Sequence, residues 1–425
     1  CRRCETMCNT VQTVGIYSAI NRGFSAVVSP PFNQPMTETP CTFCGQCVSV
    51  CPTAALTEVN ANRRILEALN DPDKYVIVQT APAIRVALGE EFGLPPGTKV
   101  TGRMVTALRQ MGFDKVIDTD FAADLTIMEE AHELLERIQN NGRLPILTSC
   151  CPAWVKFFEH SFPDLLDVPS TCKSPHEMMG AIAKTYMAEK LGIDSSKIFM
   201  VSIMPCLAKK YEAARPELSN ETYLNVDAVL STRELAQMIR EAGINFADLH
   251  REEFDQPFGT STGASIIFGT TGGVIEAAVR TAYEWITKEP LEKIDFHQLR
   301  GLSGIREATV KIGDMDIKIG IANGLGNARK LLEKVRSGEV QYHAIEIMAC
   351  PGGCINGGGQ PFHGHDWKVV EQRAAAIYKE DIKMPLRKSH ENPDIIKLYE
   401  EFLGEPGSPK AHQLLHTHYT AREWN

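Results

Sequence analysis

The sequence of 425 residues lacks the features that would assign it to several classes of protein. No apolar run approaches the roughly 18 residues of a membrane-spanning helix, and no charged segment followed by an apolar stretch indicates a secretory signal. Basic residues are not in excess, since the net charge is -9, whereas nucleic-acid binding needs a basic face. No internal repeat stands out. These absences predict a cytoplasmic protein with no membrane span and no nucleic-acid partner, which acts on small molecules or other proteins.

Cysteine, by contrast, is abundant: there are thirteen, and most of them fall in tight local groups. An odd number in so long a chain is unlike the disulfide framework of a small secreted domain, so metal ligation is the better expectation. Two of them, Cys150 and Cys151, are adjacent in TSCCPAW. Neighbouring Cα atoms about 3.8 Å apart are too close for an unstrained disulfide, which needs roughly 4.4 to 6.8 Å. At least one of this pair is therefore expected to have another partner.

Residues 41–52, CTFCGQCVSVCP, have the spacing C-x2-C-x2-C-x3-C-P. In that spacing three thiolates bind one [4Fe-4S] cluster, and the fourth turns away to a second cluster. A zinc ribbon also contains C-x2-C pairs, but it does not need four cysteines in so short a segment. The chain opens with CRRCETMCN, which repeats the last three cysteines of the pattern. We expect two N-terminal clusters, one on Cys8, Cys41, Cys44 and Cys47 and one on Cys1, Cys4 and Cys51.

The second of these clusters is one thiolate short. The spacing puts the missing cysteine three residues before Cys1, so we expect the natural chain to extend upstream. The alternative is that Cys1 is a real terminus and that this cluster is lost or incomplete.

The rest of the chain alternates apolar strands with helices, which indicates α/β layers with largely parallel sheets. Strands are predicted in 75–82, 197–206 and 342–350, in LPILTSCC, and in VDAVLS before a helix that Ser231 or Thr232 can cap. The segments 105–118 and 125–142 predict a helix with a short strand and a long helix. LTSCC, IMPC and IMAC each end a strand, and parallel sheets gather ligands beyond such ends. Residues 366–425 read as a tail with two short helices around GEPGSP, in which His416 and His418 are either metal ligands or, more commonly for such a pair, packing residues.

A second metal site is indicated by MACPGGCINGGGQP, residues 348–361. Its glycines allow backbone to approach a bulky inorganic group. Cys350 and Cys354, with Cys206 and one of the TSCC pair, would supply the four thiolates that a cubane needs.

TSCCPAW, MPCLAKK and MACPGGCINGGGQP, in this order, resemble the three active-site signatures of the iron-only (FeFe) hydrogenases, and the resemblance extends from residue 1 to about 419. It implies a [4Fe-4S] cluster bridged through a cysteine to a diiron unit with CO, cyanide and azadithiolate ligands. It also implies an α+β ferredoxin-like module (1–58), an α/β catalytic domain (59–365) of two lobes with the active site in the cleft between them, and a helical tail (366–425).

The resemblance also assigns roles to residues. Cys151, Cys206, Cys350 and Cys354 would hold the cube, with Cys354 as the bridge. Cys150 would carry protons, although it could also be a small buried apolar residue. Glu133, Ser170 and Glu130 would relay protons from Cys150 to solvent with Arg137 near the exit, although residue type alone suggests a solvated helix face. Lys209 would donate to a cyanide. The diiron pocket would be lined by Ala81, Pro82, Ser174, Met204, Pro205, Phe268, Gly269, Met348, Gly358 and Gln360.

Two glycine-rich segments, FGTTGG and NGLGNARK, lack the remaining residues of nucleotide-binding motifs, so no nucleotide site is expected. The expected reaction is the reversible oxidation of hydrogen to protons and electrons. The electrons would pass to ferredoxin, to iron-sulfur, flavin or NAD(P)-binding subunits, or to a formate dehydrogenase subunit, and maturation proteins would supply the diiron unit. An iron-sulfur assembly or electron-transfer protein and a hydrogen sensor are the alternatives. Cys150, Lys209, GGGQP and both glutamates favour the enzyme.

Overall fold

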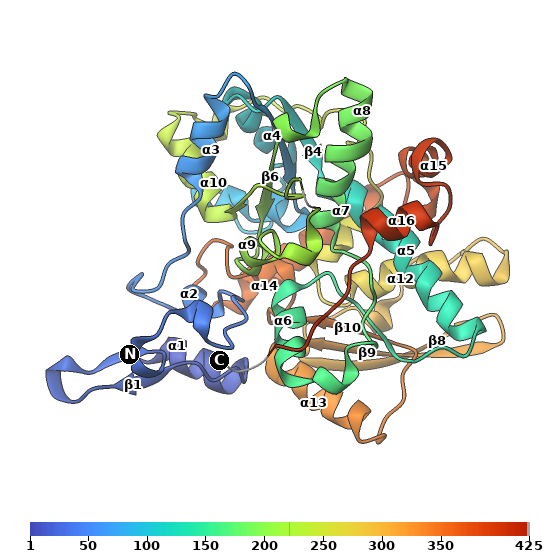
Figure 1. Ribbon diagram of the computed structural model, residues 1–425, viewed down its shortest axis with the longest axis horizontal. Coiled ribbons are helices and arrows are strands. Elements are labelled where there is room, and N and C mark those ends of the chain that lie inside the picture. The colour runs from blue at the N-terminus through green and yellow to red at the C-terminus, as the bar shows by residue number, and fades with distance from the viewer. Residues whose placement is uncertain (221, 423–425) are drawn as a thin grey trace.

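The computed structural model describes residues 1–220 and 222–422 (Figure 1). Its strands are β1 (Ser18–Ile20), β2 (Val27–Ser29), β3 (Tyr75–Thr80), β4 (Lys115–Asp118), β5 (Ile146–Leu147), β6 (Ile198–Met204), β7 (Ala228–Ser231), β8 (Ile305–Ile312), β9 (Met315–Asn323) and β10 (Ala344–Met348). Its α-helices are α1 (Arg3–Thr6), α2 (Gln46–Ser49), α3 (Asn62–Leu69), α4 (Thr101–Gln110), α5 (Thr119–Gln139), α6 (Pro152–Ser161), α7 (Pro175–Ile182), α8 (Ala188–Leu191), α9 (Ala208–Glu212), α10 (Thr232–Glu241), α11 (Gly263–Ile266), α12 (Gly273–Thr287), α13 (Leu325–Arg336), α14 (Trp367–Lys383), α15 (Pro393–Leu398) and α16 (Pro409–Leu415). None of the described helices combines the length and apolarity that a membrane crossing needs.

One sheet consists of four parallel strands in the order β4-β3-β6-β7. Val76, Ile77 and Val78 of β3 are at most 1% exposed, because helices such as α4, α5 and α10 pack against this sheet. Burial on both faces explains the continuous apolar runs of these strands. Ser231 rather than Thr232 caps α10: its hydroxyl accepts the Glu234 N–H at 3.1 Å, and the Glu234 carboxylate accepts the Ser231 N–H at 2.7 Å. The expected parallel α/β arrangement is confirmed.

The second sheet has the order β5-β10-β9-β8, with β8 antiparallel to β9 and the other pairs parallel. The expected strand at LPILTSCC is only two residues long, since the chain leaves the sheet after Leu147 and leads into the cysteine pair. The hairpin of β8 and β9 was not expected from the sequence. Its first strand alternates exposed and half-buried residues at the edge of the sheet, a weaker signal than a buried run.

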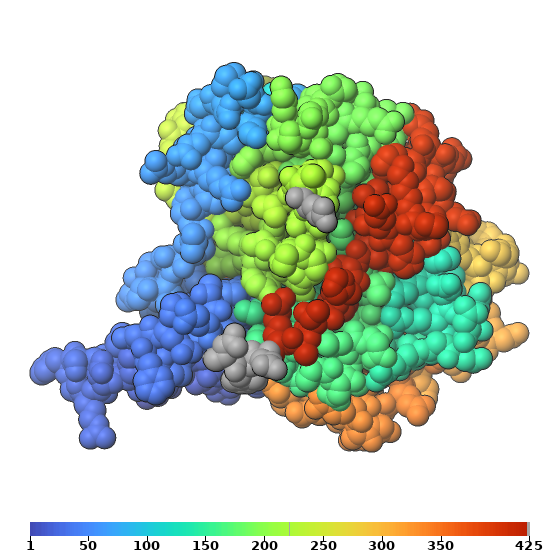
Figure 2. Space-filling view, in the orientation of Figure 1, coloured from blue at the N-terminus to red at the C-terminus, as the bar shows by residue number. Residues whose placement is uncertain are grey.

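Residues 1–58 protrude to one side of the two sheets (Figures 1 and 2). They contain α1, α2 and the antiparallel pair β1 and β2. The seven cysteines of this region lie on short helices and loops rather than on strands.

The C-terminal residues 366–422 contain α14, α15 and α16. The two short helices expected around GEPGSP are α15 and α16, and α15 continues through a π turn at Tyr399–Leu403. The longer α14, which the sequence prediction missed, packs against the turn Pro82–Val86 and against α11. This segment is therefore packed along the rest of the chain, as its red course in Figure 2 shows.

Candidate active site

The cysteines of the second metal site lie beyond the ends of strands from both sheets. Cys206 follows β6 of the first sheet, whereas Cys151 follows β5 and Cys350 follows β10 of the second sheet. Cys354 lies in the loop that Cys350 begins. The carboxyl ends of parallel strands meet at one edge of a sheet, and here the edges of two sheets bring the four residues together.

The four thiols are buried and near enough for the charge of each to act on the others. Burial raises the pKa of Cys350 well above its usual value, and the thiolates of Cys206, Cys151 and Cys354 raise it further. Burial, with the Cys151 thiolate, raises the pKa of Cys206 to about 12. None of the four forms a disulfide. Neutral sulfurs grouped in this way fit a cationic iron group that binds them as thiolates.

Glycines let the loops around these cysteines interlock. A Cβ on Gly357 would lie 2.1 Å from the carbonyl oxygen of Pro205, and one on Gly353, whose φ is 100°, would lie 2.6 Å from the Thr271 nitrogen. The loops after β6 and β10 and the 268–273 turn therefore touch through backbone. This close approach accounts for the glycines in MACPGGCINGGGQP and FGTTGG.

The residues expected to line the diiron pocket are mostly buried around these loops. Gln360 bridges two of the surrounding segments, since its amide donates to the Ala83 carbonyl at 3.1 Å and its oxygen accepts from Thr232 at 2.6 Å. Ser174 has a buried hydroxyl with no hydrogen-bond partner among the described residues. Gly358 is different: a Cβ there would lie 2.6 Å from the Cys44 carbonyl oxygen. Its close contact is with the N-terminal cysteine loop. The remaining expected residues are all buried: Ala81, Pro82, Met204, Pro205, Phe268, Gly269 and Met348.

Lys209 is buried beside the cysteine pair. Its ammonium donates to the Cys150 carbonyl at 3.1 Å and to Glu212 at 2.7 Å. Burial lowers the pKa of Lys209, but Glu212 outweighs that effect and raises it above its usual value. Glu212 also contacts His176, with its Oε2 2.9 Å from His176 Nδ1. Sequence reasoning missed Glu212 and His176, although Glu212 lies three residues after Lys209 on α9.

Glu130 is buried, and its charge acts on the Cys150 thiol. Burial, and then the charge of Glu130, raise the pKa of the Cys150 thiol well above its usual value. Burial and the charge of Glu133 raise the pKa of Glu130 to about 8, and its Oε1 has no hydrogen-bond partner within the described part of the chain. At 4% exposed, Glu130 does not belong to a solvated helix face, so that alternative is wrong for this residue.

Glu133 is the centre of a hydrogen-bonded group nearer the surface. It accepts from Ser170 at 2.8 Å and from Arg137 at 2.6 Å. Arg137 also donates to the Val168 carbonyl at 2.7 Å. The expected order had Glu133 first, but it is the charge of Glu130 that acts on Cys150, whereas Glu133 is bonded to Ser170 and Arg137. The reason is the helical repeat of α5, which places residues 130, 133 and 137 on successive turns.

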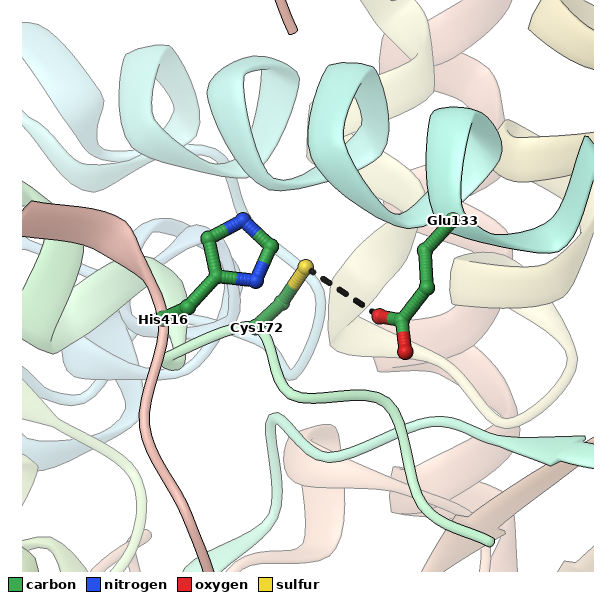
Figure 3. A group of neighbouring side chains, drawn as sticks. All are labelled: Glu133, Cys172 and His416. Atoms are coloured by element: carbon green, nitrogen blue, oxygen red, sulfur yellow. Dashed lines mark hydrogen bonds between the residues drawn. The ribbon is translucent and has the colours of Figure 1, made fainter. Parts of the chain in front are cut away.

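Two further residues join this group, as Figure 3 shows: Cys172 donates to Glu133 at 3.9 Å, and His416 lies beside both. His416 Nδ1 is 2.7 Å from the Thr171 hydroxyl, and its Nε2 is 3.0 Å from Glu129. Both ring nitrogens are therefore engaged within the protein, which favours the packing interpretation of His416. His418 is exposed. Sequence reasoning did not single out Cys172, because an isolated cysteine has no spacing pattern.

Four of the N-terminal cysteines lie around one cavity. Cys8, Cys41, Cys44 and Cys47 line one cavity of 490 Å³. Burial raises the pKa of Cys41 to about 12 and of Cys47 to about 11. This cavity and its four sulfurs fit a [4Fe-4S] cluster.

Cys51 is not among the residues that line that cavity. The backbone N–H of Thr53, with other local donors, lowers the pKa of Cys51 to about 7, and the Ala55 N–H lies 3.2 Å from its sulfur. Cys1 is exposed and Cys4 is half-buried. Cys51, whose sulfur accepts from backbone N–H groups, is suited to bind iron near the surface.

Comparison with known proteins agrees with this geometry. Residues 74–358 match the iron only hydrogenase large subunit, C-terminal domain; residues 367–422 match the iron hydrogenase small subunit; and residues 38–57 match a 4Fe-4S binding domain. The NADP-reducing hydrogenase subunit HndD of Solidesulfovibrio fructosivorans is 61% identical over 429 residues, which cover 100% of this chain and 73% of the relative. Iron hydrogenase 1 of Clostridium pasteurianum is 46% identical over 372 residues, or 87% of this chain and 65% of the relative.

Solved structures are similar as well. The apo [FeFe]-hydrogenase HydA1 from Chlamydomonas reinhardtii superposes with a TM-score of 0.77 at 43% identity, over 85% of this chain and 99% of that one. A more distant relative, the cytosolic iron-sulfur assembly component 3 of Mus musculus, is 30% identical over 402 residues, or 90% of this chain and 83% of the relative.

The chain therefore belongs to the iron-only (FeFe) hydrogenases. It is an enzyme of that family, as expected from the three cysteine signatures. Its cofactors are the [4Fe-4S] cluster and the CO-, cyanide- and azadithiolate-bearing diiron unit of the H-cluster, together with N-terminal [4Fe-4S] clusters.

Proposed function

We propose that this chain is a catalytic subunit that interconverts hydrogen with two protons and two electrons and exchanges the electrons with partner subunits or ferredoxin. The observation that carries the proposal is the grouping of four thiols from both sheets next to a fifth, Cys150, which has its own path of titratable groups. In this arrangement Cys151, Cys206, Cys350 and Cys354 would hold the cube, and Cys354 would be the thiolate shared with the diiron unit. The diiron unit supplies, when bound, an open iron that acts as a Lewis acid and an amine that acts as a base.

Proton movement falls to the side chains. Cys150 exchanges a proton with the active site and Glu130 receives it, since the pKa of Glu130 is raised to about 8 and a neutral carboxyl can remain in the interior. Ser170 and Glu133 continue the path, and Arg137 holds Glu133 at its outer end. Lys209, fixed by Glu212, presents a cation to an anionic ligand of the iron.

Electrons move through the N-terminal region. We assign the inner cluster to Cys8, Cys41, Cys44 and Cys47 and the outer one to Cys1, Cys4 and Cys51. Contact between Gly358 and the Cys44 carbonyl brings the loop of the inner cluster against the loop that carries Cys354. Residues 1–58 would thus be the ferredoxin-like module, 59–365 the two-lobed catalytic domain with its site between the lobes, and 366–425 a tail packed on it.

The partners are proposed from chemistry and likeness together. Exposed or half-buried Cys1, Cys4 and Cys51 suit electron exchange with another iron-sulfur, flavin or NAD(P)-binding subunit, and a relative is named as a subunit of an NADP-reducing hydrogenase. A formate dehydrogenase subunit is the alternative partner, and maturation proteins would deliver the diiron unit. Thirteen cysteines without a disulfide suit the reducing cytoplasm.

The rival is an iron-sulfur assembly or electron-transfer protein, which the more distant relative brings into view. A hydrogen sensor is a second rival. Cys150, Lys209 and the two glutamates have no evident use in assembly and favour turnover. Infrared spectroscopy of the anaerobically purified, matured protein tests this directly: CO and cyanide stretches together with hydrogen evolution from a reduced dye are expected. Absent stretches would contradict the diiron assignment, and stretches without evolution would favour a sensor.

A further inference from the structure

Lys156 lies beside the loop that carries Cys41 and Cys44. It stands on α6, which begins directly after Cys151, and it is only 5% exposed. Its ammonium lies 4.3 Å from the ring centre of Phe43 and 4.8 Å from that of Tyr211. Phe43 belongs to the loop between Cys41 and Cys44. The side chain thus extends from α6 and places its positive charge beside the loop that holds Cys41 and Cys44.

No carboxylate neutralises this charge within residues 1–220 and 222–422, since Lys156 forms no ion pair there. The nearby Glu159 is already bound to Arg215 and Arg422, each at 2.6 Å. Glu38 lines the same 390 Å³ cavity, together with His160 and Arg422, but it is exposed and makes no bond to Lys156. Aromatic faces alone hold the ammonium, and they attract a cation without cancelling its charge.

Phe43 stands between the expected ligands Cys41 and Cys44, so the ammonium over its ring lies beside the loop that would hold the inner cluster. Burial lowers the pKa of Lys156 to about 8, and the charge of Cys41 opposes that lowering. A [4Fe-4S] cluster on four thiolates gains one more negative charge when it accepts an electron. Because protein surroundings screen charge less than water does, a nearby cation favours the more negative, reduced state.

We propose that Lys156 raises the reduction potential of the cluster bound by Cys8, Cys41, Cys44 and Cys47, and so holds electrons at the cluster nearest the active site. The inference rests on the proposed assignment of that cluster. Cys51, at the proposed outer cluster, accepts hydrogen bonds from the backbone N–H groups of Thr53, Leu56 and Ala55 instead. Lys156 would thus act on one cluster of the relay.

The test is a redox titration of the anaerobic holoenzyme followed by electron paramagnetic resonance, with one midpoint potential fitted for each cluster. Lys156→Met keeps the length of the side chain and removes its charge. We expect one midpoint to fall by an amount equivalent to about a tenfold change in the reduction equilibrium, which is about 59 mV for one electron, while the others stay unchanged. Lys156→Arg keeps the charge and should restore the midpoint to within a small fraction of that shift.

Lys368→Met, at an exposed site on α14, is the matched control and should leave every midpoint unchanged. Lys156→Gln serves as a second neutral variant if the methionine variant fails to assemble, and iron content shows which variants retain their clusters. Unchanged midpoints in a neutral variant with full iron content would overturn the inference. A wild-type protein with no inner-cluster signal would instead overturn the proposed cluster assignment.

Discussion

Replacing Glu130 with glutamine removes the carboxyl that lies beside Cys150 while keeping the size and shape of the side chain. Because Glu130 is the buried step of the proposed proton path, hydrogen evolution should fall about 100-fold or more, the usual effect of losing a positioned acid or base. Glu136→Gln, at an exposed position of the same helix, is the matched control and should retain full turnover.

The raised pKa of Glu130 also makes the stability of the folded protein depend on pH. Burial and the charge of Glu133 raise the pKa of Glu130 from 4.5 to about 8, and each unit corresponds to about 1.36 kcal/mol. Between these two pH values the folded protein holds a proton that the unfolded chain has lost, so stability falls as the pH rises. Below pH 4.5 Glu130 causes no loss of stability, and above about pH 8 the loss in the free energy of unfolding reaches about 5 kcal/mol, an order-of-magnitude figure. The glutamine variant does not have this loss.

Thermal unfolding of the anaerobic holoenzyme at pH 5, 7 and 9 measures the difference between the wild type and the variant. The variant should gain stability relative to the wild type as the pH rises, and most of that gain should appear between pH 5 and pH 8. A difference that stays constant across the three pH values, or turnover that survives the substitution, would refute the assignment of Glu130 as a buried proton carrier.

Three other substitutions test separate parts of the site. Cys150→Ala should keep the iron content and the infrared bands but lower turnover at least about 100-fold. Lost iron in this variant would mean that the roles of Cys150 and Cys151 are exchanged. Arg137→Met leaves Glu133 without its 2.6 Å partner and should lower the free energy of unfolding, measured in urea, by about 1 to 3 kcal/mol. Arg137→Lys keeps the charge and should lower it by less. Equal losses in the two variants would show that the charge of Arg137 contributes nothing to stability. Cys41→Ser should remove about four irons per chain in an iron assay without changing the CO and cyanide bands, and altered bands would show that the two metal sites are not independent.

Part of the fold and part of the candidate site could be predicted from the sequence. Cysteine spacing predicted the N-terminal cluster ligands and the four-thiol site, because iron-sulfur ligation depends on local spacing and on strand ends. Apolar runs predicted β3, β6 and β10 because burial on both faces leaves a continuous signal. The hairpin of β8 and β9 and helix α14 gave weaker signals, since their exposed faces interrupt the apolar pattern.

Residue type and short-range spacing are enough to predict which residues can bind iron and which segments become buried parallel strands. Which groups meet depends on the three-dimensional packing: Glu130 rather than Glu133 near Cys150, Glu212 on Lys209, Gly358 on the inner-cluster loop, and Lys156 over Phe43. These contacts join residues through the packing of helices against two separate sheets. Their energies depend on distance and burial, and neither quantity is encoded in the local order of residues.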